Sequence, residues 1–190
     1  AGEAIGRAPE LGAGFVTLCM GSRDATNMWA PHPDNGTAAA WLDMRRELDA
    51  LLGAAHDAGV SLAIEPETGG VVDSALTMAR LYHELGADAA RVGVILDAAN
   101  LIVDVGRPAP EVLSEAFDRL GPRIVCLHAK DPRGWDAALE GNGQVDLQHV
   151  AALRLRHAPS APIIVQDVAP ARAAEAHAHL QRVIASVPTV

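Results

Sequence analysis

The sequence predicts an α/β fold built on parallel strands, and two observations support this prediction. Short apolar runs rich in Val, Ile and Leu alternate along the chain with longer amphipathic stretches. The runs are almost continuously apolar, which is typical of strands covered on both faces, as in a parallel sheet. Strict alternation of strand and helix predicts βα units with right-handed crossovers. An open doubly wound sheet and part of a (β/α)8 barrel both fit this pattern.

The predicted strands share a short length and a high content of aliphatic residues. They span residues 14–20, 60–65, 92–97, 123–130 and 162–167. The predicted helices span residues 37–56, 73–85, 110–120, 146–157 and 170–187. We expect Gly59 to end the first helix, and Asp73 or Ser74 to cap the second. Asp146 is the expected cap of the fourth helix, and Pro170 suits the first turn of the last.

Charge and composition exclude several classes of partner. The 190 residues include 15 Lys and Arg against 24 Asp and Glu, which gives a formal net charge of −9. This charge argues against general nucleic-acid binding and against docking on an anionic membrane. No apolar run approaches the roughly 20 residues of a membrane span. Cys19 and Cys126 lie inside apolar runs, so we expect buried thiols in a cytoplasmic protein.

Four of the five predicted strands end in a polar residue that suits metal binding. These residues are Glu65, Asp97, His128 and Gln166. In parallel α/β folds the functional site lies at the carboxyl ends of the strands. Side-chain alternation predicts that the four residues share one face, with the large aliphatic residues on the other face against the helices. Asp167 has the opposite parity, so we expect it to point away unless the strand bulges.

The segments that carry these residues resemble a known family. IEPETG, VILDAANL, LHAKD, GNGQVD and IIVQD, in this order, resemble the xylose isomerase-like barrels, the sugar phosphate isomerase/epimerase group. The segment NMWAPHPDN is similar to the loop after their fourth strand. The resemblance covers essentially the whole chain and implies one domain over residues 1–190, the C-terminal part of a TIM barrel. An open five-stranded parallel sheet is the alternative.

The sequence of 190 residues is shorter than a complete barrel of the implied kind. An eight-unit barrel takes about 250 residues, and the five predicted strands match the last five of the resembling family. The opening segment AGEAIGRAPELG, which has no initial Met, is expected to be the end of the helix before the fourth barrel strand. We therefore expect three N-terminal βα units to be absent from this sequence. An arc of five strands would leave two exposed edges.

The resemblance implies a divalent-metal site. Its ligands would be Glu65, Asp97 and His128, with Gln166 at a position where typical members have a Glu. One ion of Mn²⁺, Mg²⁺, Co²⁺ or Zn²⁺ suits such a set. In the resembling enzymes the cation holds the oxygens of a keto-sugar and stabilises the enediolate formed on proton loss.

The implied activity is that of a sugar or keto-polyol isomerase or epimerase in carbohydrate metabolism, acting on a small sugar or keto acid. Glu65 would serve as base or acid, whereas the amide of Gln166 can ligate a metal but transfers no proton near neutral pH. Two-base epimerisation is therefore in doubt, and one-base isomerisation, dehydration and retro-aldol chemistry stay open. Barrels of this group often associate, so a homo-oligomer is also open.

Further residues are candidates for substrate contact. Lys130 shares the parity of His128 and lies one step further out, so it could act on a substrate oxygen or phosphate; a solvated lysine is the alternative. Other candidates lie in the predicted loops or at a helix start: Trp29, His32, Asn100 and Arg133. For the two residues of the first loop, local packing is the alternative. For Asn100 it is a helix cap.

Two other functions compete with the isomerase hypothesis. The first is a non-catalytic or weakly active ligand-binding relative with a degraded site, and Gln166 favours it. The second is an endonuclease of the related apurinic-site type. That chemistry needs a three-metal cluster and a basic groove, so the acidic net charge and the missing ligands disfavour it.

Overall fold

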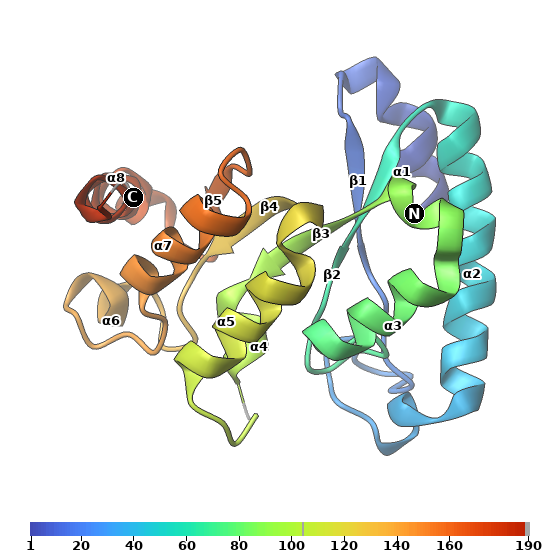
Figure 1. Cartoon of the computed structure of the whole chain (residues 1–190), viewed down its shortest axis with the longest axis horizontal. Helices are drawn as coiled ribbons and strands as arrows, with labels where there is room; N and C mark the ends of the chain where they lie inside the picture. Colours follow the sequence, from blue (N-terminus) through green and yellow to red (C-terminus); the bar gives the residue numbers. More distant parts are fainter. Residues whose placement is uncertain (104, 189–190) are drawn as a thin grey trace. The chain divides into compact units, whose positions relative to one another are not determined.

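The computed structural model describes residues 1–103 and 105–188 (Figure 1). Contacts divide the chain into two compact units, Ala1–Ile95 and Leu96–Val190, and each is described by itself below. The strands form one sheet in the order β1-β2-β3-β4-β5, with β1 and β5 as the outer strands. Strands that follow one another in the chain are therefore neighbours, as expected for consecutive βα units.

The first unit contains β1, β2 and most of β3, together with three α-helices. Its elements are α1 (Gly2–Arg7), η1 (Pro9–Leu11), β1 (Phe15–Cys19), η2 (Pro33–Gly36), α2 (Ala38–Ala58), β2 (Ser61–Glu65), α3 (Ala75–Leu85), η3 (Gly86–Arg91) and β3 (Val92–Asp97). The strands run parallel, with Cys19 opposite Glu65 and Ile64 opposite Val94. This register brings the ends of β1 and β2 to the same edge.

Local chemistry explains where the helices of this unit begin and end. The side chain of Thr37 accepts a hydrogen bond from the backbone N–H of Ala40, which starts α2. Gly59 ends α2 in the left-handed region with φ 69°, a conformation that costs glycine little. Ser74 forms a capping box with Thr77 at the start of α3, so Ser74 is the cap of this helix.

The core of the first unit joins α2 and α3 to β2. Leu48, Leu62, Ile64, Met78 and Leu81 are each fully buried. Burying one such side chain contributes about 1.5–3 kcal/mol relative to leaving it exposed. The apolar stripe of α2 and the nearly continuous apolar run of β2 therefore supply the main packing energy of this unit.

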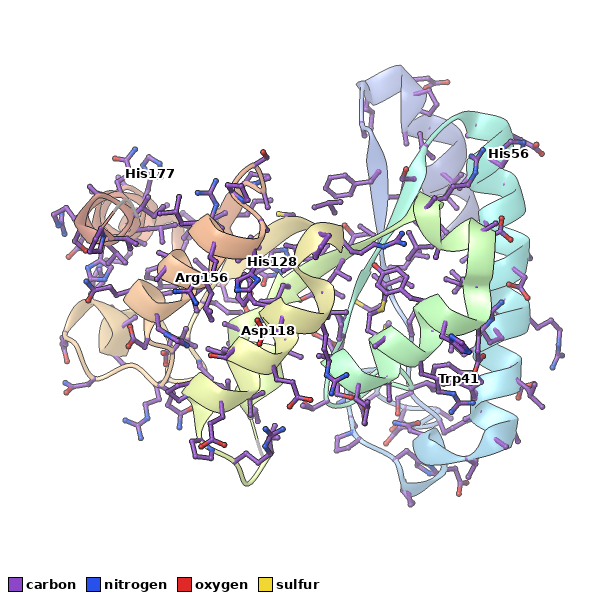
Figure 2. The ribbon with its side chains drawn as sticks, viewed as in Figure 1. Trp41, His56, Asp118, His128, Arg156 and His177 are labelled. Carbon is purple, nitrogen blue, oxygen red and sulfur yellow. The ribbon has the colours of Figure 1, made fainter. Side chains whose placement is uncertain are left out.

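A polar contact adds to the packing of α2 against α3. The indole N–H of Trp41 (Figure 2) donates to Oε2 of Glu84 at 2.7 Å. The guanidinium of Arg80 lies over the Trp41 ring, 3.9 Å from its centroid, and also pairs with Glu84. The hydrogen bond from Trp41 and, to a smaller extent, the pairing with Arg80 hold the pKa of Glu84 below its ordinary value.

The second unit contains the end of β3, two further strands and five α-helices within its described residues. These elements are α4 (Ala98–Ile102), α5 (Ala109–Leu120), η4 (Gly121–Arg123), β4 (Ile124–Ala129), α6 (Trp135–Leu139), α7 (Leu147–His157), β5 (Ile163–Val165), η5 (Pro170–Arg172) and α8 (Ala173–Ser186). β4 pairs with β5 in parallel, with His128 opposite Ile164.

Side-chain alternation along β4 and β5 agrees with the prediction. Ala129, Ile163 and Val165 belong to an apolar cluster with residues of α6 and α8. Ile164 lies between two of them in the chain and is 51% exposed. The helix-facing and opposite faces of β5 are therefore separated as the period of two requires.

Three details of this unit differ from the prediction. β5 ends at Val165 instead of Asp167, because Asp167 adopts φ 56° and leaves the extended conformation. The short helices α4 and α6 were not predicted, since five residues are too few to show a helical period. The predicted last helix begins as the 3₁₀ turn η5 and continues as α8.

Cys126 is buried as predicted, but Cys19 is half-buried, and neither forms a disulfide within the part of the chain that the structure describes. Within residues 1–103 and 105–188, no helix combines the length and apolar character needed to cross a membrane.

The lowered pKa of Glu84 predicts a pH-dependent contribution to stability. A carboxyl whose pKa is depressed in the folded state stabilises the protein above its unfolded pKa, and this contribution is lost as pH falls through the folded value. Glu84→Gln should therefore destabilise the protein slightly at pH 7 and much less at about pH 3.5. Urea unfolding at both pH values measures the difference, and an equal loss at each would contradict the prediction.

Candidate metal centre

Asp97, the last residue of β3, is fully buried. A buried carboxylate needs compensating partners, and two elements supply them. Its Oδ1 accepts from the backbone N–H of Asn100 at 3.1 Å, so Asp97 also caps α4. Its Oδ2 lies 3.4 Å from Nδ1 of His128 and 3.1 Å from Nζ of Lys130. One oxygen is therefore used by the backbone, and the other faces side chains from the region of β4.

His128 and Lys130 approach Asp97 from the same side of β4. His128 (Figure 2) lies in the strand, and Lys130 follows directly after its end. Their side chains are 10% and 15% exposed. The shared parity of residues 128 and 130, which the sequence predicted, explains why both side chains reach one carboxylate.

The segment directly after β5 carries two further polar residues, Gln166 and Asp167. The backbone of Gln166 is held on both sides: its N–H donates to the carbonyl of Ala129 at 3.0 Å, and its carbonyl accepts from the indole N–H of Trp135 at 2.7 Å. Its side-chain Oε1 is buried and accepts no hydrogen bond from the residues that the structure describes. Such an orphaned acceptor is costly in a protein interior, and an amide oxygen is a suitable metal ligand.

The expectation that Asp167 points away from this cluster is wrong. Its carboxylate Oδ2 lies 3.6 Å from Nζ of Lys130. The reason is the left-handed backbone at Asp167, with φ 56°. This conformation interrupts the alternation of the strand, and aspartate tolerates it better than most residues do.

Glu65 belongs to the first unit, where it ends β2 and is 6% exposed. Within the second unit, Asp97 and His128 each offer one ligand atom to a metal ion, and the carboxylate of Glu65 is a donor of the same chemistry. Gln166 has a buried oxygen of the kind that a fourth ligand requires. The residues therefore fit an oxygen-rich divalent site with one imidazole, which suits Mg²⁺, Mn²⁺, Co²⁺ or Zn²⁺.

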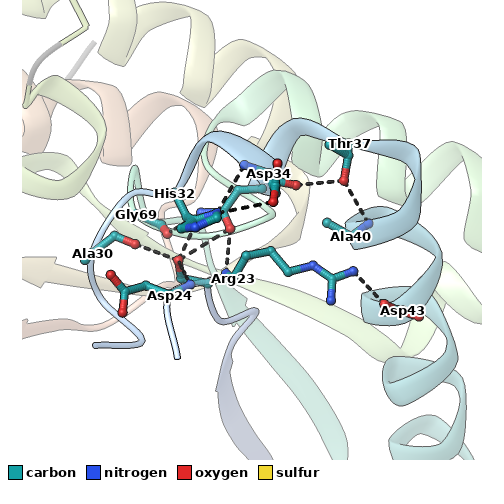
Figure 3. A network of polar contacts seen from close by, with 11 residues as sticks. Arg23, Asp24, Ala30, His32, Asp34, Thr37, Ala40, Asp43 and Gly69 are labelled. Atoms are coloured by element: carbon teal, nitrogen blue, oxygen red, sulfur yellow. Dashed lines mark hydrogen bonds and ion pairs between the residues drawn. The ribbon is translucent and has the colours of Figure 1, made fainter. Parts of the chain in front are cut away.

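Trp29 and His32 lie in the loop that precedes α2. The side chain of Trp29 is 54% exposed, whereas its backbone is tightly placed, since a Cβ on Gly69 would come within 2.1 Å of the Trp29 carbonyl oxygen. Nδ1 of His32 accepts from the backbone N–H of Asp34 at 3.2 Å, as Figure 3 shows. His32 thus caps η2, and the predicted roles of both residues in substrate binding stay predictions.

Asn100 and Arg133 are the other predicted substrate contacts. Asn100 is half-buried within α4, and its backbone N–H is bound by Asp97. Asn100 is therefore not itself the cap of this helix. The exposed Arg133 donates from Nη1 to the carbonyl of Asn142 at 3.1 Å, which ties together two parts of the loop after β4. Contact of either residue with a substrate stays a prediction.

Asp131 is a structurally important residue that the sequence analysis missed. It is 7% exposed and accepts from the backbone N–H groups of Arg133 at 2.9 Å and Val145 at 2.8 Å. A Cβ on Gly143 would come within 2.6 Å of its Oδ2. Asp131 therefore organises the loop beside Lys130. The available signal was an acidic residue directly after the polar end of a strand, in the segment LHAKD.

Comparison with known proteins agrees with the fold. A family model described as xylose isomerase-like TIM barrel matches residues 2–183, and the resemblance noted in the sequence is thereby confirmed. No curated protein sequence is significantly similar to the chain.

Several solved structures are similar to the chain. A D-tagatose 3-epimerase-like protein is 16% identical, with a TM-score of 0.72 over 98% of this chain and 67% of its own. A xylose isomerase-like TIM barrel protein from Mycobacterium smegmatis, solved with magnesium, is 19% identical, with a TM-score of 0.68 over 98% and 66%. A D-psicose 3-epimerase solved with D-fructose is 14% identical, with a TM-score of 0.72 over 96% and 68%.

The chain thus spans about two thirds of the length of these structures. At such low identities the similarity establishes the fold alone. It confirms the prediction of a TIM-barrel-type arrangement of parallel βα units.

The role of Asp131 can be tested by mutation. Asp131→Ala should lower the free energy of unfolding by about 1–3 kcal/mol, because two backbone N–H groups lose a buried charged acceptor. Asp136→Ala removes a carboxylate that is 76% exposed and serves as the control. Urea unfolding measures both variants, and equal losses would show that Asp131 has no special structural role.

Proposed function

Because the chain belongs to the xylose isomerase-like TIM barrel family, we propose that it acts as a divalent-metal-dependent isomerase or epimerase of a small keto-sugar. The observation that carries this proposal is the buried pair of Asp97 and His128, whose facing atoms lie 3.4 Å apart. Carboxylate and imidazole groups held this way at strand ends suit metal-assisted chemistry.

The metal would be held by Glu65, Asp97, His128 and Gln166. In this proposal Glu65 completes the ligand set, because it is a buried carboxylate at the end of β2, the strand that precedes β3 in the sheet order. When bound, the divalent cation supplies Lewis-acid stabilisation of the charge that develops on the oxygens of the keto-sugar.

Glu65 is the proposed proton carrier. A carboxylate can take a proton from the carbon beside a carbonyl and return it to a neighbouring carbon, which one base can do for an isomerisation. Epimerisation by two bases, one on each face of the substrate, needs a second such group. Gln166 cannot supply it, because an amide has no useful proton affinity near neutral pH. The proposal therefore favours one-base chemistry.

Lys130 is the proposed contact for a substrate oxygen or phosphate. Its ammonium group lies beside Asp97, and its side chain is 15% exposed, so it can donate hydrogen bonds where little water is present. Trp29, His32, Asn100 and Arg133 are the further proposed substrate contacts. The substrate class is suggested by the printed names of the structural neighbours, which include D-tagatose, D-psicose and L-ribulose 3-epimerases or proteins like them.

A second candidate function is ligand binding with little or no turnover. The specific observation that favours it is Gln166 at the fourth ligand position, with its Oε1 buried and without a hydrogen-bond partner. Such a site would retain affinity for metal and sugar while lacking a second proton carrier. Cys19 and Cys126, which form no disulfide among the described residues, support the accompanying proposal of a reducing, cytoplasmic location.

The proposed function predicts metal binding and metal-dependent turnover. After dialysis against a chelator, the protein should bind Mn²⁺ or Mg²⁺ in calorimetry and convert a member of a panel of ketoses, inososes and hydroxypyruvate. Glu65→Gln keeps an oxygen donor but removes the proton acceptor, so kcat should fall by about 100-fold or more. Glu47→Gln, on an exposed residue of α2, is the control. Absence of metal binding, or full activity of Glu65→Gln, would overturn the assignment.

Gln166→Glu tests the distinction between the two candidate functions. The added carboxylate should strengthen metal binding and, if a missing proton carrier limits the chemistry, should create or raise epimerase activity on the panel. Stronger metal binding with no turnover in either form would instead favour the ligand-binding protein. Isotope exchange from ²H₂O into the sugar provides the most sensitive readout of proton abstraction.

A further inference from the structure

We propose that Asp167 is a positioning residue that shares the ammonium group of Lys130 with Asp97 and so keeps Asp97 available to a divalent cation. This inference rests on the proposed metal site and concerns residues of the second unit alone. Asp167 follows the proposed ligand Gln166 in the chain and is not itself a proposed ligand.

The first argument is the arrangement of charges. Nζ of Lys130 lies 3.1 Å from Oδ2 of Asp97 and 3.6 Å from Oδ2 of Asp167. The ammonium group therefore lies between two carboxylates. The Asp97 oxygen that it approaches is also the one nearest His128, and it is the oxygen left over after the other has capped α4.

The second argument is competition for that oxygen. Oδ2 of Asp97 is the atom that this residue can offer a metal, and the ammonium group 3.1 Å away competes for it and repels an incoming cation. A second carboxylate on the far side of Lys130 reduces both effects. It attracts the ammonium away from Asp97, and it cancels part of the positive charge.

The third argument is the charge of the ligand set. With a neutral amide at Gln166, the charges of Asp97 and Lys130 cancel, so this part of the site would attract a cation weakly. Asp167 offsets the positive charge of Lys130, so that the charge of Asp97 is again available to a cation. The left-handed backbone at this residue, φ 56°, turns the carboxylate back toward Lys130, where continued β-strand geometry would have placed it on the other face.

A double-mutant cycle tests the proposal. Asp167→Asn keeps the size and the tolerance for a left-handed backbone but removes the charge. It should weaken Mn²⁺ binding by about two- to fivefold, because a largely exposed ion pair contributes no more than about 1 kcal/mol. Lys130→Met should strengthen binding, and adding Asp167→Asn to Lys130→Met should change the Kd by less than about 1.5-fold. Isothermal titration calorimetry at low salt measures all four proteins.

Asp136→Asn is the matched control. Asp136 lies in the same unit, is 76% exposed against 69% for Asp167, and pairs with Arg172 at 2.8 Å. Its removal should leave the Kd for Mn²⁺ unchanged. An unchanged Kd for Asp167→Asn, or an equal loss in the Lys130→Met background, would overturn this inference while the proposed function stands. If the wild-type protein and all variants bind no divalent cation, both are overturned.

Discussion

The burial of the Asp97 carboxylate is the constraint on which the rest of the second unit depends. An ionised group without solvent must be compensated by hydrogen bonds and opposite charge. Here one oxygen starts α4, and the other draws in His128 and Lys130. The Asp97 carboxylate thus joins the end of β3, the start of α4 and two side chains at the end of β4. It is also the central donor of the proposed metal site.

The polypeptide around this carboxylate is held by a second set of buried contacts. Asp131 binds the backbone on both sides of the loop after β4. Trp135 contributes its ring to the apolar cluster beneath α8 and donates its indole N–H to the carbonyl of Gln166. The candidate site residues are therefore held in place by Asp131 and Trp135, whose own roles are structural. This is the condition for precise placement of metal ligands.

In the proposed site, the amide at Gln166 would separate the binding of a metal from the transfer of a proton. Its oxygen is a suitable metal ligand. Because this oxygen is buried and accepts no hydrogen bond from the described residues, coordination of a cation would satisfy it. It cannot replace a carboxylate in charge or in basicity. The charge is partly recovered by Asp167, one residue further along, which pairs with Lys130.

Much of this arrangement could be predicted from the sequence, because it depends on local chemistry. Apolar runs and amphipathic stretches predicted the order of βα units. Gly59, Ser74 and Asp146 predicted helix ends, and a period of two predicted that His128 and Lys130 share a face. Each of these follows from residues close together in the chain. Only the tertiary structure decided the left-handed turn at Asp167, the short helix α4 on the Asp97 carboxylate, and the role of Asp131. These features arise where groups from separate segments must satisfy one another's charge, and no local pattern records that requirement.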